Sequence, residues 1–196
     1  MSDRIEMLLM LLPGLILGLT VHEAAHAWSA KLLGDTTAER LGRVSLNPLR
    51  HLTLWGTVAL FLIGIGWGRP VPVNINNFEK PRFHYLLTSL AGPASNLVLA
   101  SVALGILYLH PPFIVGWICH SIFFINAMLA VFNLLPIPPL DGSKIWPCII
   151  PGLSPAMSAS HSRLWMIVFI AAIYLGAIEK VMTPAFELLI TLLPAA

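Results

Sequence analysis

The sequence contains few charged residues for its length. Lys, Arg, Asp and Glu make up 10% of its 196 residues, whereas soluble globular domains carry about 25%. Such a chain lacks the polar surface that a protein needs if it faces water on all sides. Hydrophobic residues make up 57% of the chain and its mean hydropathy is +0.83; this excludes intrinsic disorder, which goes with low hydrophobicity and high charge. The composition indicates a membrane protein.

Cysteines and basic clusters are also scarce. The two cysteines, Cys119 and Cys148, lie in apolar surroundings without metal-type spacing and indicate no particular redox compartment. The formal net charge is only +2, and no basic tract or alternation of basic and aromatic residues indicates binding to nucleic acid. The length fits one domain, so we expect residues 1–196 to form a single membrane-embedded domain.

Several apolar runs are long enough for membrane-spanning helices, which need roughly 20 residues. The first run continues at helical spacing up to Gly34, a residue type that often ends helices. We predict an all-α polytopic membrane protein with about 4–6 transmembrane helices. Whether the last apolar run crosses the membrane stays open, because Pro184 interrupts it. The candidate spans are 7–32, Tyr85–Leu109, Phe113–Leu135, Leu164–Ile178 and Val181–Leu193.

The segment near 52–66 is too short for a comfortable span and contains several glycines. The loops on both sides of it, 31–51 and 67–84, are basic. A re-entrant segment would place most of the eleven Lys and Arg residues on one face of the membrane. Loops rich in Lys and Arg are favoured on the cytoplasmic side of a membrane. We therefore expect a multi-pass protein of the inner, cytoplasmic membrane with a site opening toward the cytoplasm. Re-entrant backbone also requires shelter from lipid, so we expect a cavity beside it.

The sequence His22-Glu23-Ala24-Ala25-His26 is an H-E-x-x-H motif inside the first predicted span. Residues four apart share one helical face, so both imidazoles can reach one metal ion while Glu23 takes a proton from bound water. Alternatively, the three side chains only form hydrogen bonds between helices. Ionisable groups in a spanning helix are costly and usually functional, which favours the metal site.

A catalytic zinc site usually has three protein ligands and one open position. Asp141 is the one further acidic residue set among apolar residues near the cytoplasmic end of a later span, which makes it the candidate for the third ligand. The alternative is an ordinary turn, because Asp-Gly after several prolines is a common turn signal. With a re-entrant 52–66 segment, Asp141 emerges on the same face as His22 and His26.

These residues closely resemble the site-2 protease family of intramembrane zinc metalloproteases. That family pairs H-E-x-x-H with a later N-x-x-P-x-P-x-x-D-G, which residues 133–142 match, and residues 92–96 resemble its G-P-x-x-N element. Further short stretches resemble the subgroup without PDZ domains, although His51-Leu52-Thr53-Leu54 departs from the expected pattern.

The resemblance implies one Zn2+ per chain and a membrane-spanning protein substrate. It implies that His22, His26 and Asp141 are the zinc ligands and that Glu23 is the general base. It also suggests that Asn96 and Asn133 support the substrate backbone or the oxyanion, although each asparagine could instead bridge helices. A divalent-metal transporter, or another metal-binding membrane protein, remains the alternative function.

Residues 67–75 form a second expected element of the site. The alternation of Val and Pro from Pro70 to Val73 favours an extended, edge-like backbone. A helical substrate must unwind before its carbonyls can be attacked, and such an edge could hold it as an added strand. An ordinary proline-rich loop is the competing interpretation.

Overall fold

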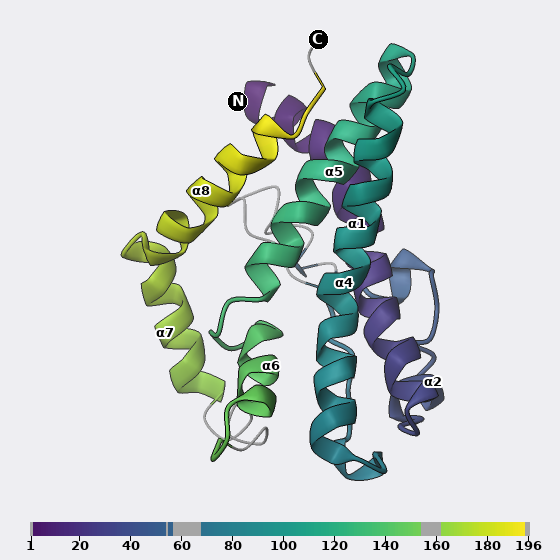
Figure 1. Cartoon of the computed structure of the whole chain (residues 1–196), viewed down its shortest axis with the longest axis vertical. Coiled ribbons are helices and arrows are strands. Elements are labelled where there is room, and N and C mark those ends of the chain that lie inside the picture. The colour runs from purple at the N-terminus through teal and green to yellow at the C-terminus, as the bar shows by residue number, and fades with distance from the viewer. Residues whose placement is uncertain (1, 54, 57–67, 154–161, 195–196) are drawn as a thin grey trace.

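The computed structural model describes residues 2–53, 55–56, 68–153 and 162–194. This part of the chain is helical, and its β-structure is limited to one isolated bridge between Leu52 and Gly68. Long helices run side by side, with short helices grouped toward one end (Figure 1). The all-α prediction is confirmed. The elements are α1 (Ser2–Leu32), α2 (Thr37–Arg40), η1 (Pro48–Arg50), η2 (Ile75–Asn77), α4 (Pro81–Leu107), α5 (Phe113–Asn133), α6 (Gly142–Ile149), α7 (Ser162–Tyr174) and α8 (Ala177–Thr191).

Three helical stretches in the described chain are long and apolar enough to cross a membrane: Leu9–Leu32, Pro81–Leu107 and Phe113–Asn133. The pair formed by α7 and α8 passes the same test only when taken together, and it bends by 61°. The described residues therefore contain three spans by length and composition, or four if the bent pair is one span. Only the count of four reaches the lower end of the predicted range of about 4–6. The break falls at Gly176, which has φ +69°, and not at Pro184, which lies inside α8.

Helices α1, α4 and α5 pack against one another and form the three-helix bundle. Small residues bring their backbones close, as is common between membrane helices. A Cβ atom at Gly14 would lie 2.2 Å from the Ser121 carbonyl oxygen of α5. Ala30 of α1 is fully buried as well.

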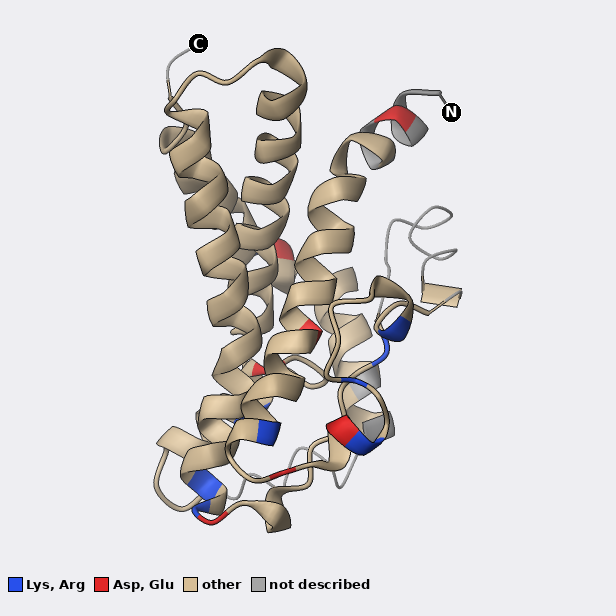
Figure 2. Cartoon of the chain, turned by 90° about the vertical axis from the view of Figure 1, so that its right-hand side faces the viewer, with Lys and Arg blue, Asp and Glu red and all other residues tan. Residues whose placement is uncertain are grey.

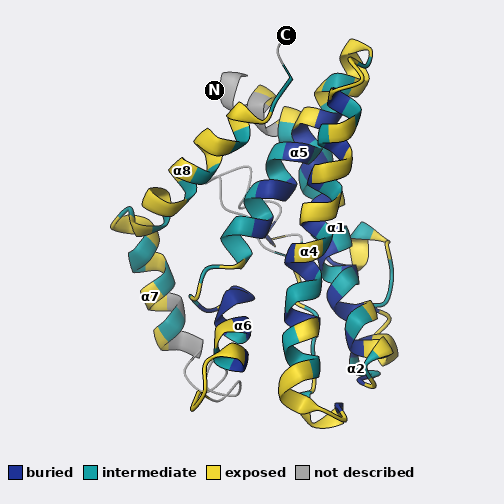
Figure 3. Ribbon diagram, in the orientation of Figure 1, coloured by how far each residue is buried: buried dark blue, intermediate teal, exposed yellow. Residues whose placement is uncertain are grey.

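Exposed residues lie on the outer faces of the helices, whereas buried residues lie mainly where the helices face one another (Figure 3). Many of the exposed residues are large and apolar. Val98, Val102 and Ile114 are more than half exposed. In contrast, the buried positions between α4 and α5 hold three alanines and Cys119 together with two larger residues, Leu107 and Phe123. An apolar exterior of this kind fits a lipid environment.

Helix α6 is fastened to the start of α4. The Arg82 guanidinium donates hydrogen bonds to the backbone oxygens of Cys148 (2.8 Å), Pro147 (3.0 Å) and Ile150 (2.6 Å). These carbonyls belong to the last turn of α6 and the residue after it, where helices leave unpaired acceptors. Arg82 therefore caps α6 and sets the position of its opposite end, which begins next to Asp141.

The loop between α1 and α4 is held by a buried carboxylate, Asp35. It accepts hydrogen bonds from the backbone N–H of Asn74 (2.7 Å), the side chain of Asn77 (2.7 Å) and both the N–H and the hydroxyl of Thr37. Burial alone would raise the pKa of Asp35, but these hydrogen bonds outweigh it and lower the pKa below its usual value. Asp35 thus ties residues 74–77 to the end of α1.

The two ends of the segment expected to be re-entrant lie together. Leu52 and Gly68 form the antiparallel bridge, and the Arg69 N–H donates to the His51 carbonyl oxygen at 2.6 Å. A segment crossing the membrane once would separate its ends by the bilayer thickness, about 30 Å. The path itself, residues 57–67, lies outside the described residues.

The second expected element, near 67–75, is described from Gly68 onward; after the bridge at Gly68, residues 69–74 have no regular secondary structure, and η2 begins at Ile75. Two carbonyl oxygens of this segment, those of Arg69 and Pro70, accept hydrogen bonds from the buried Arg43 guanidinium. The segment is therefore an anchored stretch rather than a free loop.

Helices α7 and α8 form the helical arm. Within the described chain, α8 packs on α5 and α7. Phe186 of α8 lies against Phe124 of α5, with ring centroids 5.4 Å apart, and the Tyr108 hydroxyl donates to the Leu192 carbonyl oxygen at 3.0 Å. None of the arm residues whose exposure is described is buried.

Candidate metal centre

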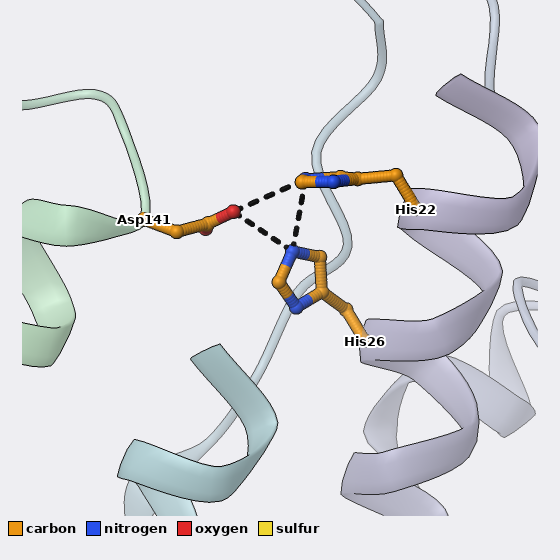
Figure 4. A group of neighbouring side chains, drawn as sticks. All are labelled: His22, His26 and Asp141. Carbon is orange, nitrogen blue, oxygen red and sulfur yellow. Dashed lines mark hydrogen bonds and ion pairs between the residues drawn. The ribbon is translucent and has the colours of Figure 1, made fainter. Parts of the chain in front are cut away.

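Two histidines and one aspartate meet inside the protein (Figure 4). The Asp141 Oδ2 atom lies 3.1 Å from His22 Nε2 and 3.0 Å from His26 Nε2, and the two Nε2 atoms are 3.1 Å apart. All three residues are buried, and they form a group that could hold a metal ion. Bonds of about 2.0 Å to zinc would place tetrahedral ligands about 3.3 Å apart. The spacing and the donor atoms therefore fit zinc.

Both histidines come from one face of α1, and a glycine of α4 makes room for them. A Cβ atom at Gly92 would lie 2.3 Å from His26 Nε2 and 2.6 Å from His22 Cε1. Any side chain there would occupy the space of the imidazoles. Gly92 is the glycine of the G-P-x-x-N element, and this close approach gives a physical reason for glycine at that position.

Each imidazole is held from behind through its Nδ1 atom. His22 Nδ1 lies 2.6 Å from the Asn96 side-chain oxygen, and His26 Nδ1 lies 2.7 Å from the Thr88 backbone oxygen. Both partner oxygens only accept hydrogen bonds, so each Nδ1 carries the proton. Each Nε2 then presents a lone pair to the centre, as a metal ligand requires.

The carboxylate of Asp141 is shared between the centre and α6. Its Oδ2 faces the histidines, whereas its Oδ1 accepts a hydrogen bond from Lys144 Nζ at 2.8 Å. Lys144 lies one turn into α6, and the α6 backbone holds Asp141 through Ile145 N–H. The Asp-Gly turn, considered from sequence as the alternative to a ligand role, leads directly into α6, and Asp141 at the start of this helix directs its carboxylate at the histidines.

Glu23 lies beside the histidines and is partly buried. Its Oε2 accepts a hydrogen bond from the Val71 backbone N–H at 3.0 Å. A cavity of about 340 Å³ opens here, and its wall brings α1, the 70–73 segment, α4 and the Asp141 region together. It is lined by His22, Glu23, His26, Pro70, Val71, Val73, Tyr85, Thr88, Ser89, Asn133, Pro139, Asp141 and Lys144.

Comparison with known proteins shows which protein family this chain resembles. Residues 113–176 match the model of peptidase family M50. The Bacillus subtilis protein named "Putative zinc metalloprotease YwhC" is 41% identical over 159 residues, covering 76% of this chain and 73% of that protein. A Mycolicibacterium smegmatis protein named "Putative zinc metalloprotease Rip2" is 32% identical over 174 residues, covering 84% of this chain and 67% of that protein. No solved structure matches significantly.

The chain belongs to peptidase family M50. The resemblance to the site-2 protease family is thereby confirmed, together with the assignment as a membrane-embedded zinc metalloprotease whose cofactor is zinc. The family match begins at α5 and includes Asn133 and Asp141, whereas His22, Glu23 and His26 precede it.

The two asparagines expected to support the substrate occupy different places in this M50 protein. Asn133 lines the cavity, and its Nδ2 donates to the Leu129 carbonyl oxygen at 2.9 Å. Asn96 is fully buried, bonds to His22 and is absent from the cavity wall. The contacts of Asn96 are those of the alternative considered from sequence, a bridge between helices.

Sequence reasoning missed three residues that build the centre, Lys144, Thr88 and Asn126, and gave Val71 only a role in holding the substrate. Lys144 holds Asp141, Val71 holds Glu23, Thr88 holds His26 through its backbone, and Asn126 bonds to Asn96. Only two of them gave a usable signal: Lys144 is one helical turn from Asp141, and Asn126 is an amide inside an apolar span. Contacts made by backbone N–H and C=O groups, such as those of Val71 and Thr88, cannot be predicted from residue type.

Proposed function

We propose that this protein is a zinc-dependent intramembrane endopeptidase that hydrolyses peptide bonds in membrane-spanning segments of its substrates. In this proposal residues 1–196 form one metalloprotease domain, His22, His26 and Asp141 hold one zinc ion, and Glu23 is the general base. The single observation that carries the proposal is the convergence of these four side chains on one cavity. Three of them come from a helix long and apolar enough to span the membrane.

Zinc bound by these residues would lower the pKa of a water molecule toward neutrality and polarise the substrate carbonyl. Glu23 would accept the proton of that water and pass it to the leaving amine. Its contacts suit this task, because Oε2 is held by Val71 N–H while Oε1 has no hydrogen-bond partner among the described residues. One oxygen thus orients the carboxylate, and the other is available for the proton.

The 69–73 segment is the proposed docking edge for the substrate. Val71 and Val73 line the cavity, whereas the carbonyl of Pro70 is held by Arg43. An unwound substrate could pair with this edge as an added strand. Asn133, on the cavity wall, is proposed to support the substrate backbone or the oxyanion. For Asn96 we propose instead a role in positioning His22, which its bond to His22 Nδ1 supports.

The proposed location is the cytoplasmic membrane, with the site opening toward the cytoplasm and lipid around the bundle. Lys and Arg residues of the described chain gather mainly at the end of the bundle that carries α2 and α6 (Figure 2). Because basic loops favour the cytoplasmic side, this end is assigned to the cytoplasm. The partners in this proposal are the lipid bilayer and a transmembrane protein substrate.

The test compares wild-type protein with Glu23→Gln in zinc content and in cleavage of a peptide containing a membrane-spanning segment. We expect Glu23→Gln to retain one zinc per chain and to lose cleavage by at least about 100-fold, the scale of general-base catalysis. Glu187→Gln on the exposed face of α8 is the matched control and should cleave normally. Equal cleavage by wild type and Glu23→Gln would reject the proposal, whereas loss of zinc in Glu23→Gln would favour a metal transporter.

A further inference from the structure

A chain of buried side-chain amides connects α5 to the metal centre. The Asn126 Oδ1 of α5 accepts a hydrogen bond from Asn96 Nδ2 of α4 at 2.8 Å, and Asn96 Oδ1 lies 2.6 Å from His22 Nδ1. Asn126 and Asn96 are both 0% exposed. We propose that Asn126 is a positioning residue which, through Asn96, keeps His22 in the form that binds metal. This inference rests on the proposed role of His22 as a zinc ligand.

The hydrogen bonds of Asn126 determine which way its amide points. Its Nδ2 donates to the Ile122 carbonyl oxygen at 2.8 Å and lies 3.4 Å from the Gly14 carbonyl oxygen. Both partners only accept hydrogen bonds, so the nitrogen of Asn126 must face them. Its oxygen therefore faces Asn96.

The same reasoning determines the orientation of Asn96. Its Nδ2 has two acceptors, Asn126 Oδ1 and, at 3.2 Å, the Gly18 carbonyl oxygen. These acceptors use both N–H groups, and the amide oxygen is left to face His22. Because Asn96 and Asn126 are fully buried, turning this amide over would leave several buried polar atoms unpaired.

The orientation of Asn96 decides the tautomer of His22. An amide oxygen can only accept, so His22 Nδ1 must carry the proton and Nε2 keeps its lone pair toward Asp141. If Asn96 presented its NH2 group instead, the proton would move to Nε2 and occupy the ligand position. Asn126 thus protects the metal-binding tautomer without contacting the histidine.

The second histidine shows why only His22 needs this support. His26 Nδ1 is held by the Thr88 backbone oxygen, and a carbonyl inside a helix cannot turn over. A side-chain amide can rotate by half a turn and exchange its oxygen for its nitrogen. The orientation of His22 therefore depends on a further residue, whereas that of His26 does not.

Close helix packing allows the amides to reach one another. A Cβ atom at Gly18 would lie 2.8 Å from Asn126 Oδ1. The small residue on α1 therefore leaves the space in which the amide of α5 lies. The network joins all three helices of the bundle behind the metal ligands.

The experiment measures how fast purified holoenzyme in detergent loses zinc to an excess of chelator. We expect Asn126→Leu to speed zinc loss by roughly 10-fold, the lower end of the effect of removing a partner of a metal ligand. Asn126→Ala is the second variant, in case leucine does not fit between the helices. Ser121→Ala is the matched control, because it removes the buried bond from Gly14 N–H to Ser121 Oγ (3.0 Å) on the same α1–α5 interface.

A double-mutant cycle separates positioning from general loosening of the bundle. We expect Asn96→Ala to speed zinc loss, and adding Asn126→Leu to Asn96→Ala to cause little further change, since both act on His22 through one path. If the double variant lost zinc at a rate increased by the product of the two single-variant factors, the inference would be overturned. It would also be overturned if Asn126→Leu lost zinc no faster than Ser121→Ala.

His22→Ala separates failure of this inference from failure of the proposed function. If His22→Ala keeps its zinc, the ligand set is wrong and both proposals fall. If His22→Ala loses zinc while Asn126→Leu behaves like Ser121→Ala, only the role of Asn126 is rejected.

Discussion

The three-helix bundle and the helical arm are both strongly apolar, yet they treat polar groups differently. In the bundle, polar side chains such as Asn96 and Asn126 are fully buried and paired with one another. In the arm, no residue of described exposure is buried, and Glu179, Lys180 and Glu187 line a shallow outer pocket. An apolar helix surface therefore indicates only that the helix suits a lipid environment. Paired polar groups buried inside a bundle indicate the region that carries the metal centre.

Gly92→Val in the bundle should have the largest effect. Its side chain would collide with both imidazoles, since even a Cβ atom would lie 2.3 Å from His26 Nε2. We expect loss of stoichiometric zinc and of cleavage, measured by metal analysis and peptide hydrolysis. Gly105→Val on the same helix, where a Cβ atom meets nothing within 4 Å, is the control. Normal zinc content in Gly92→Val would contradict the described packing.

Val71→Pro should affect cleavage while sparing zinc. Proline removes the N–H that bonds to Glu23 Oε2, so the carboxylate loses its support. We expect cleavage to fall roughly 10-fold with one zinc retained. Val73→Pro should also impair cleavage if the segment pairs with substrate. Unchanged turnover in both variants would remove the docking edge from the proposal.

Acid should destabilise the protein partly through Asp35. Because hydrogen bonds lower the pKa of Asp35 in the folded state, its contribution is present above the unfolded pKa of about 3.9 and is lost as pH falls through the lower folded value. Asp35→Asn removes this contribution, so we expect a flatter dependence of thermal stability on pH below about 4. Identical pH profiles for wild type and Asp35→Asn would show that the carboxylate adds nothing.

Arg82→Met should have a smaller effect, because Arg82 is exposed and two of its three hydrogen bonds, to the carbonyls of Pro147 and Ile150, are exposed. We expect a decrease of about 1 kcal/mol in the free energy of unfolding. A modest increase in zinc loss should accompany it, since α6 carries the bonds that aim Asp141. Arg40→Met, at an exposed position in α2, is the control. If Arg82→Met and Arg40→Met had the same free energy of unfolding, the hydrogen bonds of Arg82 to α6 would not contribute to stability.

Phe186→Ala in the arm should have the smallest effect on the metal centre. It removes the ring contact with Phe124, worth about 1 kcal/mol, and neither ring is among the residues that line the cavity. We expect zinc retention equal to wild type in the chelator assay. Zinc loss comparable to that of Gly92→Val would show that the arm and the bundle are not separate in function.

Much of the fold and of the metal centre was predictable because it depends on local pattern. The long apolar runs indicated α1, α4 and α5, and the four-residue spacing of His22 and His26 placed both on one helical face. The bend of the arm was harder to place. Both Gly176 and Pro184 are helix-breaking residue types, and only the surrounding contacts decide which one ends the helix.

The residue types and their order were enough to determine a membrane protein with helical spans and a candidate metal motif, because apolarity and helical periodicity act over a few turns of one segment. Only the tertiary structure decided which groups stand behind that motif. Asn126 meets Asn96, Val71 meets Glu23, and Gly92 faces both imidazoles. These contacts depend on how each helix is rotated about its axis and where each loop returns, and such geometry arises only when the whole bundle packs.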